Sequence, residues 1–469
     1  IPFYESFKKE HIPQDVDLIV HSAAYNPETN AELREAVRRS LKIRKYTDAL
    51  GEYSADFFSA GICGVHGKTT TTALAGTIIR ALGLPAQVLA GSAVSTFAPE
   101  GAEARSTLYL GEKYFVAETC EYRGHFLSFN PKIIVLTNIE HDHQDFFPTY
   151  QSIFDIFIRY IDKISNGGTL IYCADDRGAA EAAAIARNKG ITLIPYGFTA
   201  EGDYKITLLE NPPPGRIAWT LGISKGRRFS LRVPGRHNVL NAAAATALCA
   251  TLAQHEAEAV RGGATPDGGS GTAAGGTAGG GTAAGGNATP DGGMEHGRLD
   301  ETFAKIGGAL ETFAGSKRRG EIVGEAGGIL FMDDYGHHPT AIAATLVGLR
   351  GFYPNRRLIV SFMSHTYTRT AALLDAFSRC FAAADMLFLH KIYPSARETY
   401  TGEVSGITLF EETKKHHANT YYVDEYMDAI PSILPILKVG DIFLTMGAGD
   451  NWKLGKKLYE LAEKAEIKP

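Results

Sequence analysis

The stretch AGICGVHGKTTTT, residues 60–72, is the most informative part of this chain of 469 residues. Its small and apolar start predicts a strand, which runs into a glycine loop and then into a helix from Lys68 to about Leu82. Such a unit binds phosphate because backbone N–H groups at a helix start, a flexible turn and a lysine all face the anion. A hydroxyl directly after the lysine can hold Mg²⁺. The candidate nucleotide-binding residues are Gly64, Gly67, Lys68, Thr69 and Thr70.

This loop is a shortened form of the eight-residue phosphate loop, which would have glycine at the position of Ile62. The alternative interpretation is a glycine-rich turn between a strand and a helix, followed by an exposed lysine. The order of strand, loop and helix favours nucleotide binding. We therefore expect Lys68 to be an exposed ligand of the outer phosphates.

Strands and helices alternate along most of the chain, which is typical of an α/β fold with parallel sheets covered by helices. Short strands between Lys205 and Val233 predict a small antiparallel edge. Near the start, Val16–Ser22 predicts a strand, and Pro27 is expected to open a helix that runs to about Leu41. The other expected strands are Tyr114–Glu118, Ile133–Asn138, Thr169–Cys173, Ile329–Asp333, Leu358–Phe362, Met386–Leu389 and Ile442–Met446. The other expected helices are Tyr150–Ser165, Asp176–Lys189 and Asn238–Ala253.

Residues 262–293 differ in kind from the rest, because ATPDGG and GTAAGG each occur twice there. Glycine, alanine and threonine offer too little apolar surface to offset the entropy of ordering, so we expect a flexible insertion without function. The predicted domains are residues 1–50, residues 51–310 with this insertion, and residues 311–469.

Composition limits the classes of protein to which the chain can belong. Hydrophobic residues make up 44% and charged residues 21%, as in a globular protein, and the net charge of -5 gives no electrostatic case for nucleic acid. The five cysteines have no CxxC spacing, so no disulfide framework is expected. Without a signal peptide or a membrane-spanning run, we expect a cytoplasmic protein with no membrane insertion, as a monomer or weak dimer. The chain starts at Ile1 within an apparent αβ unit, and we expect an upstream segment to be missing.

Acidic and imidazole side chains follow two of the expected central strands. Glu118 ends the strand YFVAE, where a carboxylate facing a phosphate loop can bind Mg²⁺, and Glu121 is a rival for that role. Asn138, Glu140, Asp142 and His143 follow the strand IIVLT, a pattern that suggests a metal or phosphate site. The alternative is a loop of solvated polar groups.

Two further motifs follow strands of the last block. DDYGHHP begins at Asp333, and its two histidines could merely cap the helix that Pro339 opens. SHTYTRT begins at Ser364, and its Arg369 could bind a carboxylate or a phosphate through a two-pronged contact. Each motif is weak by itself, but ligands of open α/β sheets bind at the carboxyl ends of the strands.

The motifs in this order resemble the Mur ligase family from about Asp15 to the C-terminus, the insertion excluded. The matching stretches are GVHGKTTTT, AETCEYRGHFLSF, TNIEHDHQDFF, PGRHNVLNAAAA, KRRGE, DDYGHHPT, SHTYTRT and TMGAGD. The resemblance implies the remnant of an N-terminal UDP-binding domain, a central P-loop-type ATPase domain with a parallel sheet and a C-terminal Rossmann-like domain. It also implies that ATP phosphorylates the carboxylate of UDP-N-acetylmuramate and that the amine of L-alanine attacks the acyl phosphate, with ATP and Mg²⁺ as cofactors.

Carried over position by position, the resemblance assigns roles to individual residues. Lys68 holds the outer phosphates, and Asn138 lies beside the acyl phosphate. The implied metal ligands are Thr69, Glu118 and His143. The implied contacts of adenine, phosphates and ribose are His237, Asn238, Arg319 and Asp334. The implied substrate contacts are Ser22 for UDP and Tyr335, His337 and Arg369 around the incoming amino acid.

The chain departs from the family pattern at Gly320, where phenylalanine is usual, and at Thr366, where some members have arginine. The glycine-rich turn of the first domain is absent. Three alternatives stay open: a recycling ligase that adds a tripeptide to the same sugar nucleotide, a more distant folylpolyglutamate synthase, and a nucleotide-binding regulator without ligase activity.

Overall fold

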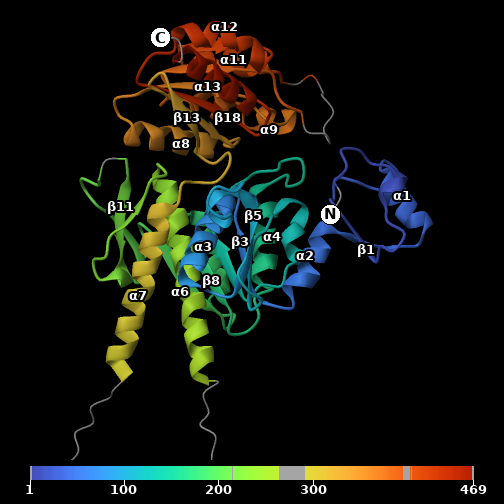
Figure 1. The fold of residues 1–469 in the computed structure, drawn as a ribbon, viewed down its shortest axis with the longest axis vertical. Coiled ribbons are helices and arrows are strands. Elements are labelled where there is room, and N and C mark those ends of the chain that lie inside the picture. Colours follow the sequence, from blue (N-terminus) through green and yellow to red (C-terminus); the bar gives the residue numbers. More distant parts are fainter. Residues whose placement is uncertain (1–2, 214, 263–290, 395–401, 403, 467–469) are drawn as a thin grey trace, which may run out of the picture.

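The computed structural model describes residues 3–213, 215–262, 291–394, 402 and 404–466. The chain forms three sheets in three successive parts, which we call the N-terminal part (residues 3–54), the central part (residues 58–313) and the C-terminal part (residues 316–466). Figure 1 shows the C-terminal part above the central part and the N-terminal part at the side of both. The predicted α/β class is confirmed, with sheets in which parallel pairs dominate.

The central part contains a ten-stranded sheet in the order β12-β11-β10-β9-β8-β7-β3-β6-β4-β5. The strands from β10 to β4 run parallel, whereas β5 at one edge and β11 and β12 at the other are antiparallel to their neighbours. The antiparallel edge expected after Lys205 is thereby confirmed. The strands are β3 (Phe58–Cys63), β4 (Ala86–Val94), β5 (Arg105–Tyr109), β6 (Tyr114–Glu118), β7 (Ile133–Leu136), β8 (Thr169–Cys173), β9 (Thr192–Gly197), β10 (Tyr204–Leu208), β11 (Ile217–Leu221) and β12 (Phe229–Leu231).

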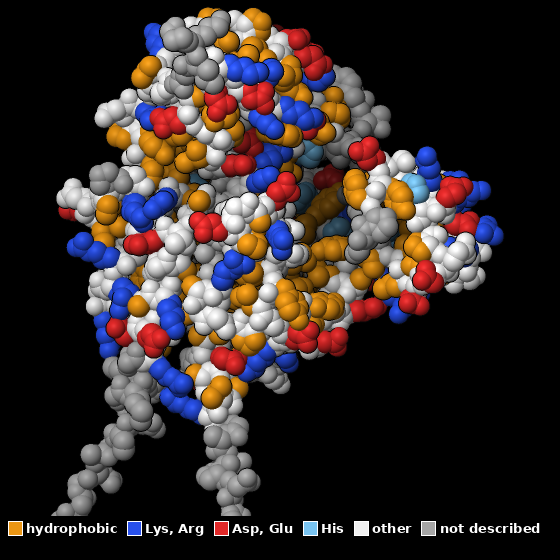
Figure 2. Space-filling model, in the orientation of Figure 1, with side chains coloured by type: hydrophobic (Ala, Val, Ile, Leu, Met, Phe, Trp, Pro, Cys, Tyr) orange, Lys and Arg blue, Asp and Glu red, His pale blue; other side chains and the backbone are white. Residues whose placement is uncertain are grey.

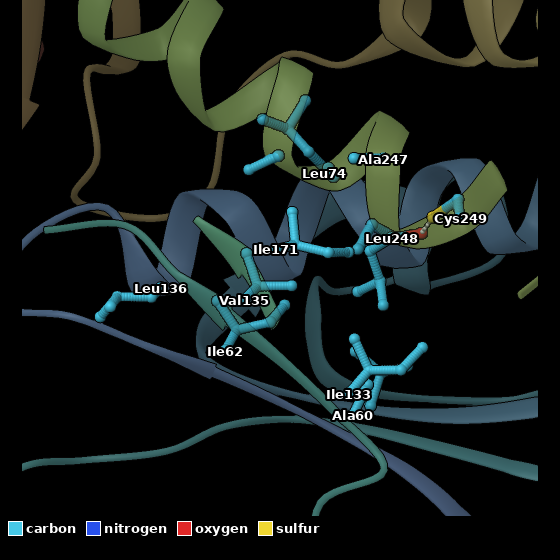
Figure 3. Packing of buried hydrophobic residues seen from close by; sticks show 14 of the residues in the cluster. Ala60, Ile62, Leu74, Ile133, Val135, Leu136, Ile171, Ala247, Leu248 and Cys249 are labelled. Carbon is cyan, nitrogen blue, oxygen red and sulfur yellow. Dashed lines mark hydrogen bonds between the residues drawn. The ribbon is translucent and has the colours of Figure 1, made fainter. Parts of the chain in front are cut away.

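Helices cover this sheet, and two of them pack on the strand that leads into the glycine loop. Ile62 and Val135 point from the sheet toward Leu74 and Leu248, which lie on two helices above it (Figure 3), and all four side chains are fully buried. Burial of each such side chain contributes roughly 1.5–3 kcal/mol. The helices of the central part are α3 (Lys68–Leu82), α4 (Tyr150–Ile161), α5 (Arg177–Ala186), α6 (Arg236–Gly262) and α7 (Asp291–Thr312).

The long helices α6 and α7 flank the predicted insertion. Residues 263–290 of that insertion lie outside the described residues, while Gly262 ends α6 and Asp291 begins α7. The predicted domain boundaries at residues 50 and 310 fall inside α2 (Tyr46–Ser54) and α7, and the three-domain division stays a proposal. Among the described residues, the helices are all too short or too polar to cross a membrane.

The N-terminal part is a small unit in which β1 (Leu18–His21) pairs in parallel with β2 (Lys42–Lys45). Helix α1 (Ala31–Arg38) joins them, so the expectation that Pro27 opens a helix is wrong. The side chain of Asn30 accepts a hydrogen bond from the backbone N–H of Leu33 and so starts the helix later.

The C-terminal part is a six-stranded sheet in the order β13-β14-β18-β15-β16-β17, parallel except for the pair of β13 and β14. Buried apolar side chains line both faces of the sheet. Its strands are β13 (Glu321–Ala326), β14 (Ile329–Asp334), β15 (Arg357–Phe362), β16 (Met386–Leu389), β17 (Thr420–Tyr422) and β18 (Asp441–Met446). Its helices are α8 (Pro339–Phe352), α9 (Tyr367–Ala372), α10 (Leu374–Arg379), α11 (Gly406–Lys414), α12 (Ile430–Ile433) and α13 (Trp452–Glu466).

The carboxyl ends of the two large sheets face each other across a cleft. The loops after β3, β6 and β7 meet the loops after β14 and β15, and together they line one cavity. Figure 2 shows the surface hollowed between the C-terminal part and the parts below it, with histidine side chains in the walls. Ligands of parallel sheets bind at such ends, so the fold directs attention to this cleft.

Candidate active site

The cleft holds a cavity of about 410 Å³ that brings together nearly all the site residues expected from the sequence. These residues come from three loops of the central part, the start of α6, and the C-terminal part. The expected residues that line it are Gly67, Lys68, Thr69, Thr70, Glu118, Asn138, His143, His237, Asn238, Arg319, Asp334, Tyr335, His337 and Arg369. Gly64 and Ser22 do not line it.

The glycine loop needs its two glycines for steric reasons. A Cβ on Gly64 would lie 2.0 Å from the Thr137 hydroxyl, and one on Gly67 would lie 2.5 Å from the Asn241 side-chain oxygen. Both residues also have positive φ angles, 131° and 81°, which disfavour other side chains. The loop thereby brings backbone N–H groups of the first turn of α3 to the cavity, where an anion can accept their hydrogen bonds.

Lys68 is the first residue of α3, and its side chain is only 13% exposed, so the expectation of an exposed lysine is wrong. Its Nζ donates to the carbonyl oxygens of Gly64 and Val65 and lies 2.9 Å from Glu121 Oε2. Burial, the largest single effect, lowers the pKa of Lys68, but the nearby acidic groups, led by Glu121, together raise that pKa above its usual value. The lysine is therefore a fixed cation at the cavity wall.

The expected metal ligands lie in two neighbouring groups. The hydroxyl of Thr69 donates to Glu118 Oε1 over 3.1 Å, and the backbone N–H of Gly91 donates to Glu118 Oε2 over 2.8 Å. His143 lies with its Nε2 3.4 Å from Glu121 Oε1. Glu118 is thus the carboxylate beside the hydroxyl, whereas its rival Glu121 pairs with the lysine and the histidine.

Asn138 braces the glycine loop from the end of β7. Its side-chain oxygen accepts a hydrogen bond from the backbone N–H of His66 over 2.9 Å, and its carbonyl oxygen accepts one from Val65. The His66 ring in turn lies 3.0 Å from Glu140. The asparagine therefore links the shape of the phosphate loop to the loop that carries the acidic and imidazole side chains.

Arg369 reaches from α9 across the cleft to Asp142. Its Nε lies 2.9 Å from Oδ1 and its Nη2 lies 3.3 Å from Oδ2, and both side chains are buried. Burial, the largest single effect, would raise the pKa of Asp142, but the charge and hydrogen bond of Arg369, with two nearby histidines, together hold that pKa well below the usual value. Arg369 is thus a desolvated cation that already contacts a carboxylate in two-pronged geometry.

His337 lies close to this pair, and its Nδ1 is 3.0 Å from the carbonyl oxygen of Tyr335. Burial lowers the pKa of His337 well below its ordinary value, and the charge of Arg369 lowers it further. The ring is therefore neutral near pH 7. A neutral imidazole can accept a proton or orient an amine without adding positive charge.

Arg319 and Asp334 extend the C-terminal wall. The Arg319 guanidinium lies 4.8 Å from the centre of the Tyr335 ring, and its Nη2 lies 3.5 Å from the Thr69 hydroxyl. Asp334 accepts hydrogen bonds from the backbone N–H groups of Gly320 and Gly336, each over 2.7 Å. Burial raises its pKa. Arg319 thus reaches the phosphate loop from the opposite part of the chain.

The cavity also has apolar surface among its lining residues. His237 and Asn238 stand at the start of α6, and Val233, Leu240 and Leu349 contribute apolar surface. Burial lowers the pKa of His237 to about 4, with a smaller contribution from His66. A neutral ring beside apolar groups fits a flat heterocycle better than a charged group.

Ser22 lies apart from the other expected residues. It lines a smaller hollow of about 250 Å³ together with His21, Tyr46 and Thr47 of the N-terminal part and His125 of the central part. The structure therefore joins Ser22 to the central part but does not bring it to the main cavity.

The partners of two carboxylates of the site were not predicted from the sequence, which offered Glu121 only as a rival of Glu118 for Mg²⁺ and Asp142 only as part of a possible metal or phosphate site. Glu121 is 1% exposed and binds Lys68, and Asp142 is 2% exposed and binds Arg369. Both are acids that follow central strands within the motifs quoted above, which is the signal that could have found them. Each of these buried carboxylates offsets the charge of a cation of the cavity wall, Glu121 that of Lys68 and Asp142 that of Arg369.

The arrangement suits phosphoryl transfer. Lys68 and Arg319 converge on the start of α3, and the Thr69–Glu118 pair provides oxygen donors for a divalent cation. Arg369 lies elsewhere in the same cavity and can bind a second anionic group.

Comparisons with known proteins agree with this geometry. Residues 62–249 match the family model of the Mur ligase middle domain, and residues 318–449 match the Mur ligase, glutamate ligase domain. The UDP-N-acetylmuramate–L-alanine ligase of Treponema pallidum (strain Nichols) is 43% identical over 461 residues, which cover 98% of this chain and 86% of the relative. The ligase of the same name from Borreliella burgdorferi is 34% identical over 457 residues, which cover 97% and 88%.

One solved structure gives the same fold. A UDP-N-acetylmuramate-alanine ligase from Thermotoga maritima superposes with a TM-score of 0.69 and 19% identity, covering 99% of this chain and 89% of that one. At this identity the match speaks for the fold alone.

Proposed function

This chain belongs to the Mur ligase family, whose members are ATP-dependent ligases, and we propose that it joins L-alanine to the carboxylate of UDP-N-acetylmuramate. The observation that carries the proposal is the 43% identity to a ligase of that name over 98% of this chain. The convergence of Lys68, Arg319 and Arg369 on one cavity supports it independently. The reaction would make an early precursor of peptidoglycan.

ATP would lie along the cavity from the start of α6 to the glycine loop. His237 and Asn238 would contact adenine, and Asp334 would contact the ribose. The N–H groups after Gly67, together with Lys68 and Arg319, would bind the phosphates. Lys68 would have to exchange its bond to Glu121 for the outer phosphates, which is a small movement of one side chain.

Thr69, Glu118 and His143 would hold Mg²⁺. The hydroxyl and the carboxylate fit this hard cation because they are oxygen donors already within 3.1 Å of each other. When bound, Mg²⁺ would neutralise charge on the phosphate oxygens. Lys68 and the helix start would orient the same oxygens, while Asn138 would keep the loop in shape through His66.

The acyl end of the reaction would lie near Arg369. A carboxylate oxygen of UDP-N-acetylmuramate takes the γ-phosphoryl group of ATP and releases ADP. The amine of L-alanine then attacks the acyl carbon, loses a proton and displaces phosphate. Arg369 would bind the carboxylate of alanine, while Tyr335 and the neutral His337 would orient the amine. Ser22 would contact UDP in the smaller hollow.

The test is phosphate release by the purified chain with ATP, Mg²⁺ and UDP-N-acetylmuramate. L-alanine should start turnover, and the tripeptide L-alanyl-γ-D-glutamyl-diaminopimelate should not. Turnover with the tripeptide alone would make the chain a recycling ligase instead. ATP binding without turnover on either acceptor would leave a nucleotide-binding protein and overturn the ligase proposal.

A further inference from the structure

A cluster of two histidines and one glutamate bridges the central and C-terminal parts in the wall of the main cavity, which both histidines line. His66 comes from the glycine loop, Glu140 from the loop after β7, and His338 from the residue before α8. His66 Nε2 lies 3.0 Å from Glu140 Oε2, and His338 Nδ1 lies 3.9 Å from Glu140 Oε1. One ligand atom from each residue lies within 4.8 Å of the other two.

The His338 ring shows that this cluster is incomplete. The residue is 3% exposed, and neither of its ring nitrogens has a hydrogen-bond partner among the described residues. Leaving a buried polar group without a partner costs roughly 1–3 kcal/mol. Its Nδ1 lies 3.9 Å from Glu140 Oε1, beyond hydrogen-bond distance, and its ring centre lies 4.9 Å from that of His66, so a ligand bound among the three residues would supply the missing partner.

We propose that His66, Glu140 and His338 form a binding site for a divalent cation of the zinc class. The proposed ligase reaction does not need a cation at this position. Two imidazoles and one carboxylate are the protein ligands of many three-ligand zinc sites, with a fourth position left for water. Magnesium prefers oxygen donors and would bind this set poorly. The spacing of 3.0 Å between His66 and Glu140 is near the roughly 3.3 Å that two ligands at zinc bond lengths adopt in a tetrahedral site.

The surroundings of the cluster support the same assignment. The hydroxyl of Thr340 donates a hydrogen bond to Glu140 Oε1 from the C-terminal side and so orients the carboxylate, whose Oε2 faces His66 Nε2.

This site shares no residue with the expected Mg²⁺ ligands Thr69, Glu118 and His143. Its ligands come from both sides of the cleft, because His66 and Glu140 belong to the central part and His338 to the C-terminal part. A cation bound there would tie the two parts together. We therefore expect a bound cation to favour the closed form of the cleft, even without nucleotide.

The experiment uses the full chain without nucleotide and titrates it with Co²⁺, whose visible absorption reports its coordination, and with Zn²⁺ in competition. We expect one Co²⁺ per chain, displaced by Zn²⁺. His338→Ala and Glu140→Gln should each weaken binding by at least about tenfold. Two controls should bind Co²⁺ like the unmodified chain: Glu118→Gln, which alters the expected Mg²⁺ site, and His416→Ala, which removes an exposed histidine.

A second readout separates a site from a misfolded variant. Glu140→Gln keeps the size of the side chain, so its melting temperature without metal should match that of the unmodified chain, while its Zn²⁺-induced rise in melting temperature should disappear. The proposal would be overturned if the His338→Ala and Glu140→Gln variants bound Co²⁺ as tightly as the unmodified chain does. Loss of Co²⁺ binding in Glu118→Gln would overturn it as well. If ATP with Mg²⁺ alone shifts the His338 ring resonances and Zn²⁺ does not, the ring serves the nucleotide and the metal site is refuted.

Discussion

Arg369 and Asp142 lie 227 positions apart in the sequence, yet they form a buried two-pronged ion pair across the cleft. In this pair the guanidinium group of Arg369 binds a carboxylate of the protein itself. An incoming amino acid offers the same chemical group, so Asp142 holds the position that a substrate carboxylate would take or share. Substitution of Arg369 is therefore the most direct test of the proposed binding site for the amino acid.

Arg369→Ala should raise KM for L-alanine by roughly 10- to 150-fold, the equivalent of one charge-assisted interaction of about 1.5–3 kcal/mol. KM for ATP should stay within about twofold, since Lys68 and Arg319 are the proposed ligands of the phosphates. Arg369→Lys should restore only part of the lost affinity for L-alanine, because lysine cannot form the two-pronged contact of a planar guanidinium group. Arg379→Ala removes an exposed arginine from the neighbouring helix and serves as control. An equal rise in KM for ATP would assign Arg369 to the phosphate site.

Lys68→Ala should abolish turnover. Because its partner Glu121 is 1% exposed, the variant leaves a buried carboxylate with fewer cations, and the free energy of unfolding should fall, by up to about 3–5 kcal/mol. Adding Glu121→Gln should restore the melting temperature and leave turnover absent. Steady-state phosphate release and thermal melting measure the two effects separately. Phosphate release that persists in Lys68→Ala would remove the lysine from the mechanism.

Gly67→Ala and Gly83→Ala form a matched pair at the two ends of α3. Both glycines have left-handed φ angles, 81° and 68°, so each alanine should cost roughly 1–2 kcal/mol of stability. Only at Gly67 does the added methyl meet a neighbour, the Asn241 side chain at 2.5 Å, next to the phosphate site. ATP titration should show weaker binding for Gly67→Ala alone. Similar nucleotide affinities in the two variants would contradict the role given to the loop.

Lys68 and Asp334 line one cavity from different parts of the chain, and both are proposed contacts of one ATP. We therefore expect an ATP analogue with UDP-N-acetylmuramate to tighten the cleft, since closure excludes water from phosphoryl transfer. Small-angle scattering should give a smaller radius of gyration with both ligands. Superimposable profiles with and without them would count against closure.

Replacing residues 263–290 by a short glycine–serine linker should leave kcat, KM and the melting temperature nearly unchanged. The composition of that stretch offers little apolar surface to bury. The proposed catalytic residues near α6 lie at its first turn, whereas the replaced stretch follows its last residue, Gly262. A fall of several degrees in the melting temperature would reveal a structural role.

Local chemistry made much of the fold predictable. Tyr114–Glu118 and Thr169–Cys173 are strands with the predicted bounds. Both are short apolar runs between turn residues, a pattern typical of a buried strand. The helix after the glycine loop also ends where expected, at Leu82. The start of α1 was missed because the side-chain hydrogen bond of Asn30 outweighs the helix-starting preference of Pro27.

The pairings inside the site could not be predicted in the same way. Lys68 was expected to be exposed, but a loop 53 residues away brings Glu121 against it. The contact of Arg369 with Asp142 depends on how two separate sheets meet, which no local pattern encodes. The residue types of the site follow from the motifs, whereas their partners follow from the packing of the two parts. The roles proposed for the individual residues stay predictions.

Helix α6 runs without interruption from Arg236, next to the cavity residue His237, to Gly262, 27 residues that span about 40 Å. One end of this rod touches the proposed adenine site, and the other points away from the C-terminal part (Figure 1). A donor fluorophore at the distal end and an acceptor on α11 would therefore report the cleft as a change in energy transfer. Because the donor sits on a rigid helix, changes in energy transfer in single molecules would report each opening and closing of the cleft.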